Sequence, residues 1–263
     1  MKLLDLTRPL DAADMDRLPA FMKGLHGVIV PEIEFRSPDG VGAEHLCYSM
    51  GCTRDDLPDG EGWGEEQLTF NSHIGTHVDA PLHYGTTCEG KKARTISDIA
   101  LEELYVDGLV LDMRGRSQVG EAMTVDALKE AIAENGGEIT PGCALMIRTG
   151  QEDYDVSDPR FYTYPGMSRE GTLFLASTGA KILGTDALGW DRPFMVMRQK
   201  FQETGDKAEI WDGHFAGRDS EVFIIQQMYQ LGQLPPNGFK VGFFPLRLVN
   251  CSASPARVVA FVE

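Results

Sequence analysis

A segment between residues 73 and 85 restricts the fold of this chain more than any other feature. It reads HIGTHVDAPLHYG and holds three of the six histidines in the sequence. Gly75 and Pro81 exclude a regular helix here, because glycine disfavours a helix and proline removes one of its hydrogen bonds. His73 and His77 therefore cannot meet through helical spacing, and the segment must be extended and bent.

The polar side chains of this segment can nevertheless converge. In an extended chain His77 and Asp79 point to the same face, and a turn at Gly75 can bring His73 back toward them, because glycine adopts positive φ at little cost. Imidazole and carboxylate are usual ligands of Zn²⁺ and Mn²⁺. The pattern predicts a metal site made by His73, His77 and Asp79, with His83 close by. The alternative is a solvated loop with unrelated histidines.

Apolar runs and capping residues predict the rest of the fold. Thr124 can cap a helix over residues 125–134 that Gly136 ends, and Ser168 can cap another. Strands are expected at the short apolar runs 3–6, 108–112, 144–149, 222–225, 239–244 and 258–262. Strands interleaved with helices predict a single α/β domain, residues 1–263, with a mixed sheet. Residues 11–64 lack sustained periodicity and are expected to cover the substrate or to form an oligomer contact.

Composition argues against several kinds of partner. The chain has 24 Lys and Arg against 40 Asp and Glu, a net charge of −16, which argues against nucleic acid and against anionic membrane surfaces. No run approaches the roughly 18 apolar residues of a spanning helix, and the first residues do not resemble a secretory signal. We therefore expect a cytoplasmic protein.

The five cysteines are scattered and include no CxxC pair. Neither a disulfide framework nor a thiolate zinc site is expected, and the thiols are expected to be reduced. Cys47 and Cys52 lie on either side of Gly51 and could join a soft-metal site, although no further ligand supports this interpretation.

The pattern HxGTHxDxPxHxG, complete in the segment 73–85, resembles the signature of the cyclase-like metal-dependent hydrolases, a family that includes bacterial kynurenine formamidases and isatin hydrolases. Weaker matches follow in the same order along the chain, at LDLT (4–7), MIRTG (146–150), ILGTD (182–186), residues 238–245 and SPAR (254–257). The resemblance implies a swivelling β/β/α fold, hydrolysis of an amide bond by metal-activated water, and a homodimer or larger homo-oligomer.

The resemblance also implies roles for individual residues. The metal ligands would be His73, His77 and Asp79, and His83 would be the general base. The family has a distal histidine followed twelve residues later by a glutamate, and the two help to hold a second zinc in the formamidases. Here His214 matches the histidine, but Gln226 stands in place of the glutamate.

The exchange of glutamate for glutamine changes the expected metal content. An amide oxygen is neutral and a weaker ligand than a carboxylate, so the repulsion between two adjacent cations is less offset. One divalent metal per chain is therefore expected, as in the isatin hydrolase branch, with Gln226 as a further ligand or a substrate contact. Because the remaining ligands are nitrogen and oxygen rather than sulfur, Mn²⁺ is favoured over Zn²⁺.

The expected reaction opens a cyclic amide of a small aromatic substrate, isatin to isatinate. His83 would accept the water proton and protonate the leaving nitrogen, and His214 or Gln226 would help to polarise the carbonyl. Candidate walls of an aromatic pocket are Trp63, Phe70 and Trp211, with core packing as the alternative for each.

Two other functions are alternatives to the opening of a cyclic amide. One is deformylation of N-formylkynurenine, against which Gln226 counts. The other is a non-catalytic protein that binds a metal or a small molecule, against which His83 counts, because a purely structural site has no use for an additional base.

Overall fold

The computed structural model describes residues 1–263, and its largest element is a closed sheet. The strands of this sheet are β1 (Lys2–Asp5), β4 (His77–Asp79), β7 (Tyr105–Asp112), β8 (Ala144–Arg148), β9 (Ile182–Thr185), β10 (Phe223–Gln226), β11 (Phe239–Pro245) and β12 (Ala253–Val262). Their order is β1-β12-β11-β7-β8-β9-β10-β4, and β4 pairs back onto β12, so that the sheet closes into a barrel with β1 attached outside the ring. The neighbours from β7 to β10 are parallel and the other pairs antiparallel, which confirms the expected mixed sheet.

Five α-helices accompany the sheet. They are α1 (Val41–Met50), α2 (Val125–Asn135), α3 (Arg169–Ser177), α4 (Phe194–Thr204) and α5 (Asp212–Phe215). The Thr124 hydroxyl accepts a hydrogen bond from the Ala127 amide at the start of α2, and Gly136 ends the helix in the left-handed conformation. Ser168 caps α3 in the same way, so both predicted caps are confirmed. No helix is long and apolar enough to cross a membrane.

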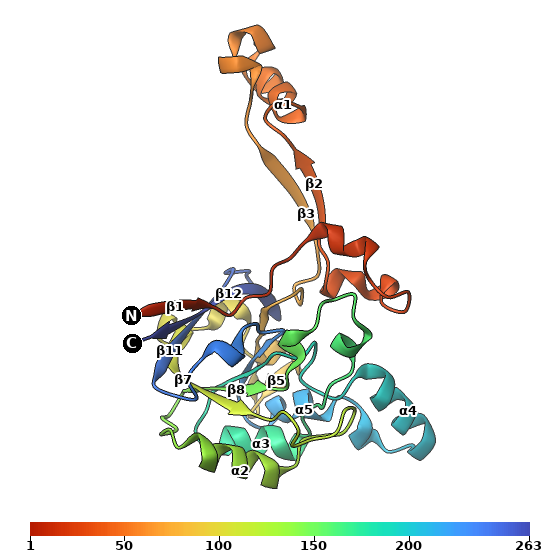
Figure 1. The fold of residues 1–263 in the computed structure, drawn as a ribbon, viewed down its shortest axis with the longest axis vertical. Helices are drawn as coiled ribbons and strands as arrows, with labels where there is room; N and C mark the ends of the chain where they lie inside the picture. Colours follow the sequence, from red (N-terminus) through yellow and green to blue (C-terminus); the bar gives the residue numbers. More distant parts are fainter.

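The central strands are apolar along their whole length because both of their faces are buried. In β7, Val110 points into the barrel interior, whereas Leu109 and Leu111 point outward to the layer of α2 and α3. In β10, Phe223 and Ile225 lie in the inner cluster and Ile224 in the outer one. The barrel therefore has two cores that share its wall, and the helices α2 and α3 cover one side (Figure 1).

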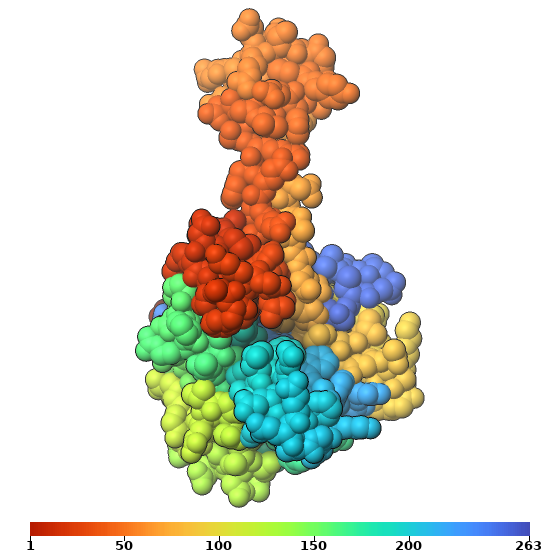
Figure 2. Space-filling view, turned by 90° about the vertical axis from the view of Figure 1, so that its right-hand side faces the viewer, coloured from red at the N-terminus to blue at the C-terminus, as the bar shows by residue number.

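A long projection rises from the barrel (Figures 1 and 2). It consists of the antiparallel strands β2 (Glu32–Arg36) and β3 (Glu65–Thr69), with α1 between them at the far end. We call residues 32–69 the arm and the rest of the chain the body. A short second ribbon, β5 (Thr87–Cys88) with β6 (Lys91–Lys92), lies in the body.

Residues 11–64 lack sustained periodicity, yet they include the regular elements β2 and α1 of the arm. Helix α1 escapes prediction because it has no apolar stripe: it buries only Gly42 and Ala43. The strands β2 and β3 expose large side chains such as Phe35 and Leu68. The arm thus has no core of its own.

Candidate metal centre

The strand β4 fixes the middle of the histidine segment. It is only three residues long, but it pairs with β10 on one side and with β12 on the other, and all its residues are buried. His77 and Asp79 therefore lie on the same face, as the alternation predicts. Gly75 has a φ of +54° and makes the expected turn before the strand. The turn returns His73 to the face that carries the other two residues.

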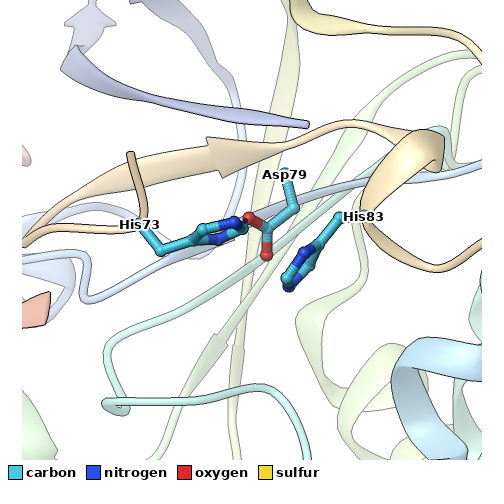
Figure 3. A group of neighbouring side chains, drawn as sticks. All are labelled: His73, Asp79 and His83. Atoms are coloured by element: carbon cyan, nitrogen blue, oxygen red, sulfur yellow. Dashed lines mark ion pairs between the residues drawn. The ribbon is translucent and has the colours of Figure 1, made fainter. Parts of the chain in front are cut away.

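The donor atoms of His73, Asp79 and His83 all lie within 4.8 Å of one another. His73 Nδ1 is 2.8 Å from Asp79 Oδ1, and the ring centroids of His73 and His83 are 3.9 Å apart. Figure 3 shows the carboxylate of Asp79 between the two imidazole rings. His83 reaches this position from the short turn Pro81–His83, directly after β4. The structure therefore groups His83 with the donor atoms more tightly than the sequence suggests.

His77 completes the cluster from the other side of the carboxylate. Its Nδ1–H donates to the Gly75 carbonyl oxygen at 2.7 Å, which leaves Nε2 with a free lone pair 3.5 Å from Asp79 Oδ1. Both of these atoms are buried and make no hydrogen bond of proper geometry, although the His73 Nδ1 atom lies 2.8 Å from the same carboxylate oxygen. Buried polar atoms are normally satisfied, so two such atoms facing each other fit a bound cation. Nitrogen and carboxylate oxygen donors of this kind suit Zn²⁺ or Mn²⁺.

The protonation states are those that a metal requires. Burial lowers the pKa of His83 to about 3, and it also lowers the pKa of His77. Burial alone would raise the pKa of Asp79, but the imidazoles of His77 and His83 hold it well below its usual range. His77 and His83 are thus neutral imidazoles beside a charged carboxylate, and metal ligands bind in these forms.

His214 approaches the same carboxylate from helix α5. Its Nε2 lies 3.5 Å from Asp79 Oδ2, and its Nδ1 is hydrogen-bonded to Asp191 Oδ2. Burial opposes the charged imidazole, but Asp191 and Asp79 raise the pKa of His214 to about 9. Asp191 also accepts the Gly213 amide at 2.6 Å, so one buried carboxylate holds both the backbone and the ring. Sequence reasoning missed Asp191, because no spacing links it to His214.

Gln226 turns its amide nitrogen toward the cluster. Its Oε1 accepts a hydrogen bond from the Trp190 backbone N–H at 3.0 Å, and its Nε2 donates to Asp79 Oδ2 at 2.5 Å. The backbone of Trp190 thereby fixes which end of the amide faces Asp79. In this orientation Gln226 is a hydrogen-bond donor to Asp79, and its oxygen is directed away from the donor cluster.

The three aromatic residues expected around the substrate occupy different places. Trp211 stacks on His214 with ring centroids 4.4 Å apart, and its ring lies 4.9 Å from that of His83. Trp63 lies in the arm, where its carbonyl contacts Gly42 of α1. Phe70 directly follows β3 at the base of the arm and is partly exposed. Of the three, Trp211 is the one that lies beside the histidines.

The fold and the donor cluster define a mixed α/β barrel protein with a His/Asp/His site that fits a metal ion. The model of the Cyclase family matches residues 4–192, and the chain belongs to this family. It is 26% identical over 195 residues to a kynurenine formamidase of Sphingopyxis alaskensis, which covers 71% of this chain and 75% of that protein. It is 25% identical over 196 residues to the Bordetella pertussis kynurenine formamidase, and the match covers 73% of this chain and 78% of that protein.

Solved structures share the whole fold. Isatin hydrolase A from Ralstonia solanacearum superimposes with a TM-score of 0.73 at 23% identity, over 100% of this chain and 92% of that one. Isatin hydrolase A from Labrenzia aggregata, bound to benzyl benzoate, superimposes with a TM-score of 0.72 at 20% identity, over 99% of this chain and 93% of that one. These likenesses show that the fold expected from the sequence is correct.

Proposed function

We propose that this protein is a metal-dependent amidohydrolase that opens a cyclic amide of an aromatic substrate, isatin to isatinate. The observation that carries the proposal is the position of His83, a potential base whose donor atom lies within 4.8 Å of those of His73 and Asp79, while His77 faces the same carboxylate. A structural metal site has no need of such a base. Membership of the Cyclase family and the fold shared with isatin hydrolases support the same activity.

The ligands would be His73, His77 and Asp79. A divalent ion held there supplies water whose pKa is lowered toward about 7. His83, which lies beside these ligands, would take up a proton from the attacking water and return it to the leaving nitrogen. His214, kept charged by Asp191, donates a hydrogen bond to the oxygen on which negative charge develops. Trp211 offers its ring as one wall for the aromatic substrate.

Turnover and metal content of two variants test these roles. His83→Ala should lose at least about 100-fold in turnover, the usual contribution of a general base, and keep its metal. The matched variant His77→Ala should lose both its turnover and its bound metal, because the substitution removes a metal ligand. The rates come from spectrophotometric assays and the metal content from elemental analysis of the purified proteins. Loss of metal from His83→Ala would assign His83 to the ligand set and refute its role as the base.

We propose one divalent ion per chain, with Mn²⁺ favoured over Zn²⁺. Gln226 supports a single ion because its Nε2 occupies Asp79 Oδ2, the carboxylate oxygen that a second ion would need. In Gln226→Glu a carboxylate replaces this donor, so we expect metal content to rise from one to two per chain. Elemental analysis after loading with Mn²⁺ or Zn²⁺ measures it. Two ions in the unaltered protein would contradict the proposal.

The second candidate is deformylation of N-formylkynurenine. It is favoured by the sequence relatives, which are kynurenine formamidases. A screen of isatin and related cyclic amides against formanilides separates the two activities, and metal binding without turnover of either class would favour a non-catalytic binding protein.

We further propose that residues 1–263 act as one domain in a cytoplasmic homodimer or larger homo-oligomer. The exposed ribbon of β2 and β3 supports this assembly, because its apolar side chains Phe35 and Leu68 have no cover within the chain. A second copy of the chain would cover them.

A further inference from the structure

The end of helix α1, at the tip of the arm, brings two cysteines together. Gly51 follows the helix with a φ of +68°, and the backbone N–H groups of Gly51 and Cys52 both donate to the Cys47 carbonyl oxygen, the latter at 3.1 Å. The bond from Cys52 back to Cys47 is the 6→1 bond of a Schellman motif, in which the side chains of these two positions commonly touch. Here both side chains are thiols.

The two thiols are close, accessible and held in place. Partial desolvation and a hydrogen bond with the Cys52 thiol raise the pKa of Cys47. Both cysteines are partly exposed, and the intervening Tyr48 is 91% exposed, so that small molecules reach the pair. Next to them, Arg54 donates to two carbonyl oxygens of residues 39 and 40 at 2.8 Å each, which ties the two ends of the tip together.

We propose that Cys47 and Cys52 are a modification site, a dithiol that a small disulfide such as glutathione disulfide oxidises reversibly to an intramolecular disulfide. A disulfide requires Cα atoms no more than about 7 Å apart. The 3.1 Å hydrogen bond between the two backbones keeps the Cα atoms within about that distance, given standard bond lengths. The inference is independent of the proposed function, since the site lies on the arm and uses none of the residues of the metal centre.

The oxidation proceeds by two thiol–disulfide exchanges. One cysteine thiolate attacks a sulfur of glutathione disulfide, forms a mixed disulfide and releases one glutathione thiolate. The second cysteine thiolate then attacks the protein sulfur of the mixed disulfide and releases the second glutathione. The protein loses two protons and two electrons, and both end on the two glutathione thiols that are formed.

The other cysteines lack these features. Cys88 and Cys143 are buried, and burial raises the pKa of each to about 11. Cys251 is partly exposed, but its thiol faces the carbonyl oxygen of Val249 rather than a second thiol. Cys251 therefore serves as the matched control for an exposed cysteine without a neighbour.

The test exposes the full chain to glutathione disulfide under native conditions and then maps its thiols by mass spectrometry. Both cysteines fall in the tryptic peptide 37–54, which should lose the mass of two hydrogen atoms and regain it on reduction. Cys251→Ser should behave as the unaltered protein. Cys47→Ser should instead carry a stable glutathione adduct on Cys52. Two free thiols in the peptide, two glutathione adducts, or only crosslinks between chains on non-reducing gels would each overturn the proposal.

Discussion

The body of the protein buries side chains on both faces of its sheet, whereas the arm leaves most of its own side chains in solvent. Phe223 in the body is fully buried, but Phe35 in the arm is 68% exposed. Helix α2 packs Leu128 and Ala131 onto the barrel, whereas α1 buries only two small residues. The two regions are parts of one chain with different sources of stability.

This difference explains where the metal centre lies. A site that must hold imidazoles neutral and a carboxylate charged needs burial and fixed neighbours. The body provides both, because β4 is paired on its two edges and closes the barrel. A two-stranded ribbon is marginally stable by itself, so the arm is suited to contacts with another surface rather than to chemistry.

Truncation of a buried and an exposed aromatic residue measures the contrast most directly. Phe223→Ala should lower the free energy of unfolding by about 3–5 kcal/mol, because it leaves a cavity in the barrel interior. Tyr48→Ala, at the tip of the arm, should change it by less than about 0.5 kcal/mol. Denaturant titration followed by circular dichroism gives both values. Similar losses for the two variants would show that the arm folds as part of the body.

The features of the body that were predictable from the sequence have local causes. The cap at Thr124 and the stop at Gly136 set the limits of α2, and the spacing of His77 and Asp79 places both on one face of a strand. These signals lie within a few residues of the structure they produce. The positive φ of Gly75 follows from the same kind of local reasoning.

The features that escaped prediction depend on contacts between distant residues. The barrel closes through β4 and β12, which are more than 170 residues apart, and β9 is short and without a distinct pattern. Asp191 holds His214 across 23 residues. The orientation of Gln226 depends on the backbone of Trp190, which no side-chain pattern encodes. The chemistry that a side chain can perform is predictable from its residue type. The distant residue that orients this side chain is not predictable in the same way.

The second prediction concerns the surface that the arm offers to another subunit. Phe35→Ser should weaken self-association by roughly 30-fold, because covering a phenylalanine in an interface contributes about 2 kcal/mol. The control is Val119→Ser, an exposed apolar residue of the body. Sedimentation over a range of concentrations reports the dissociation constant. A monomeric unaltered protein, or equal association of the two variants, would contradict the prediction that the arm forms a contact between subunits.

The smallest expected effect comes from two glycines with the same backbone conformation. Gly136 ends α2 in the body and Gly51 ends α1 in the arm; each has a φ of +68°, and a Cβ at either position would meet no atom within 4 Å. Alanine should therefore cost about 1 kcal/mol locally at both, from backbone strain alone.

The two substitutions should differ in how far this cost spreads. Gly136→Ala should lower the free energy of global unfolding by about 1 kcal/mol, because α2 is packed on the barrel core. Gly51→Ala should leave global unfolding unchanged and accelerate amide hydrogen exchange in α1 only, because the arm opens without disturbing the body. Equal shifts in global stability would mean that the arm and the body unfold together, and the contrast between them would then be one of shape rather than of cooperativity.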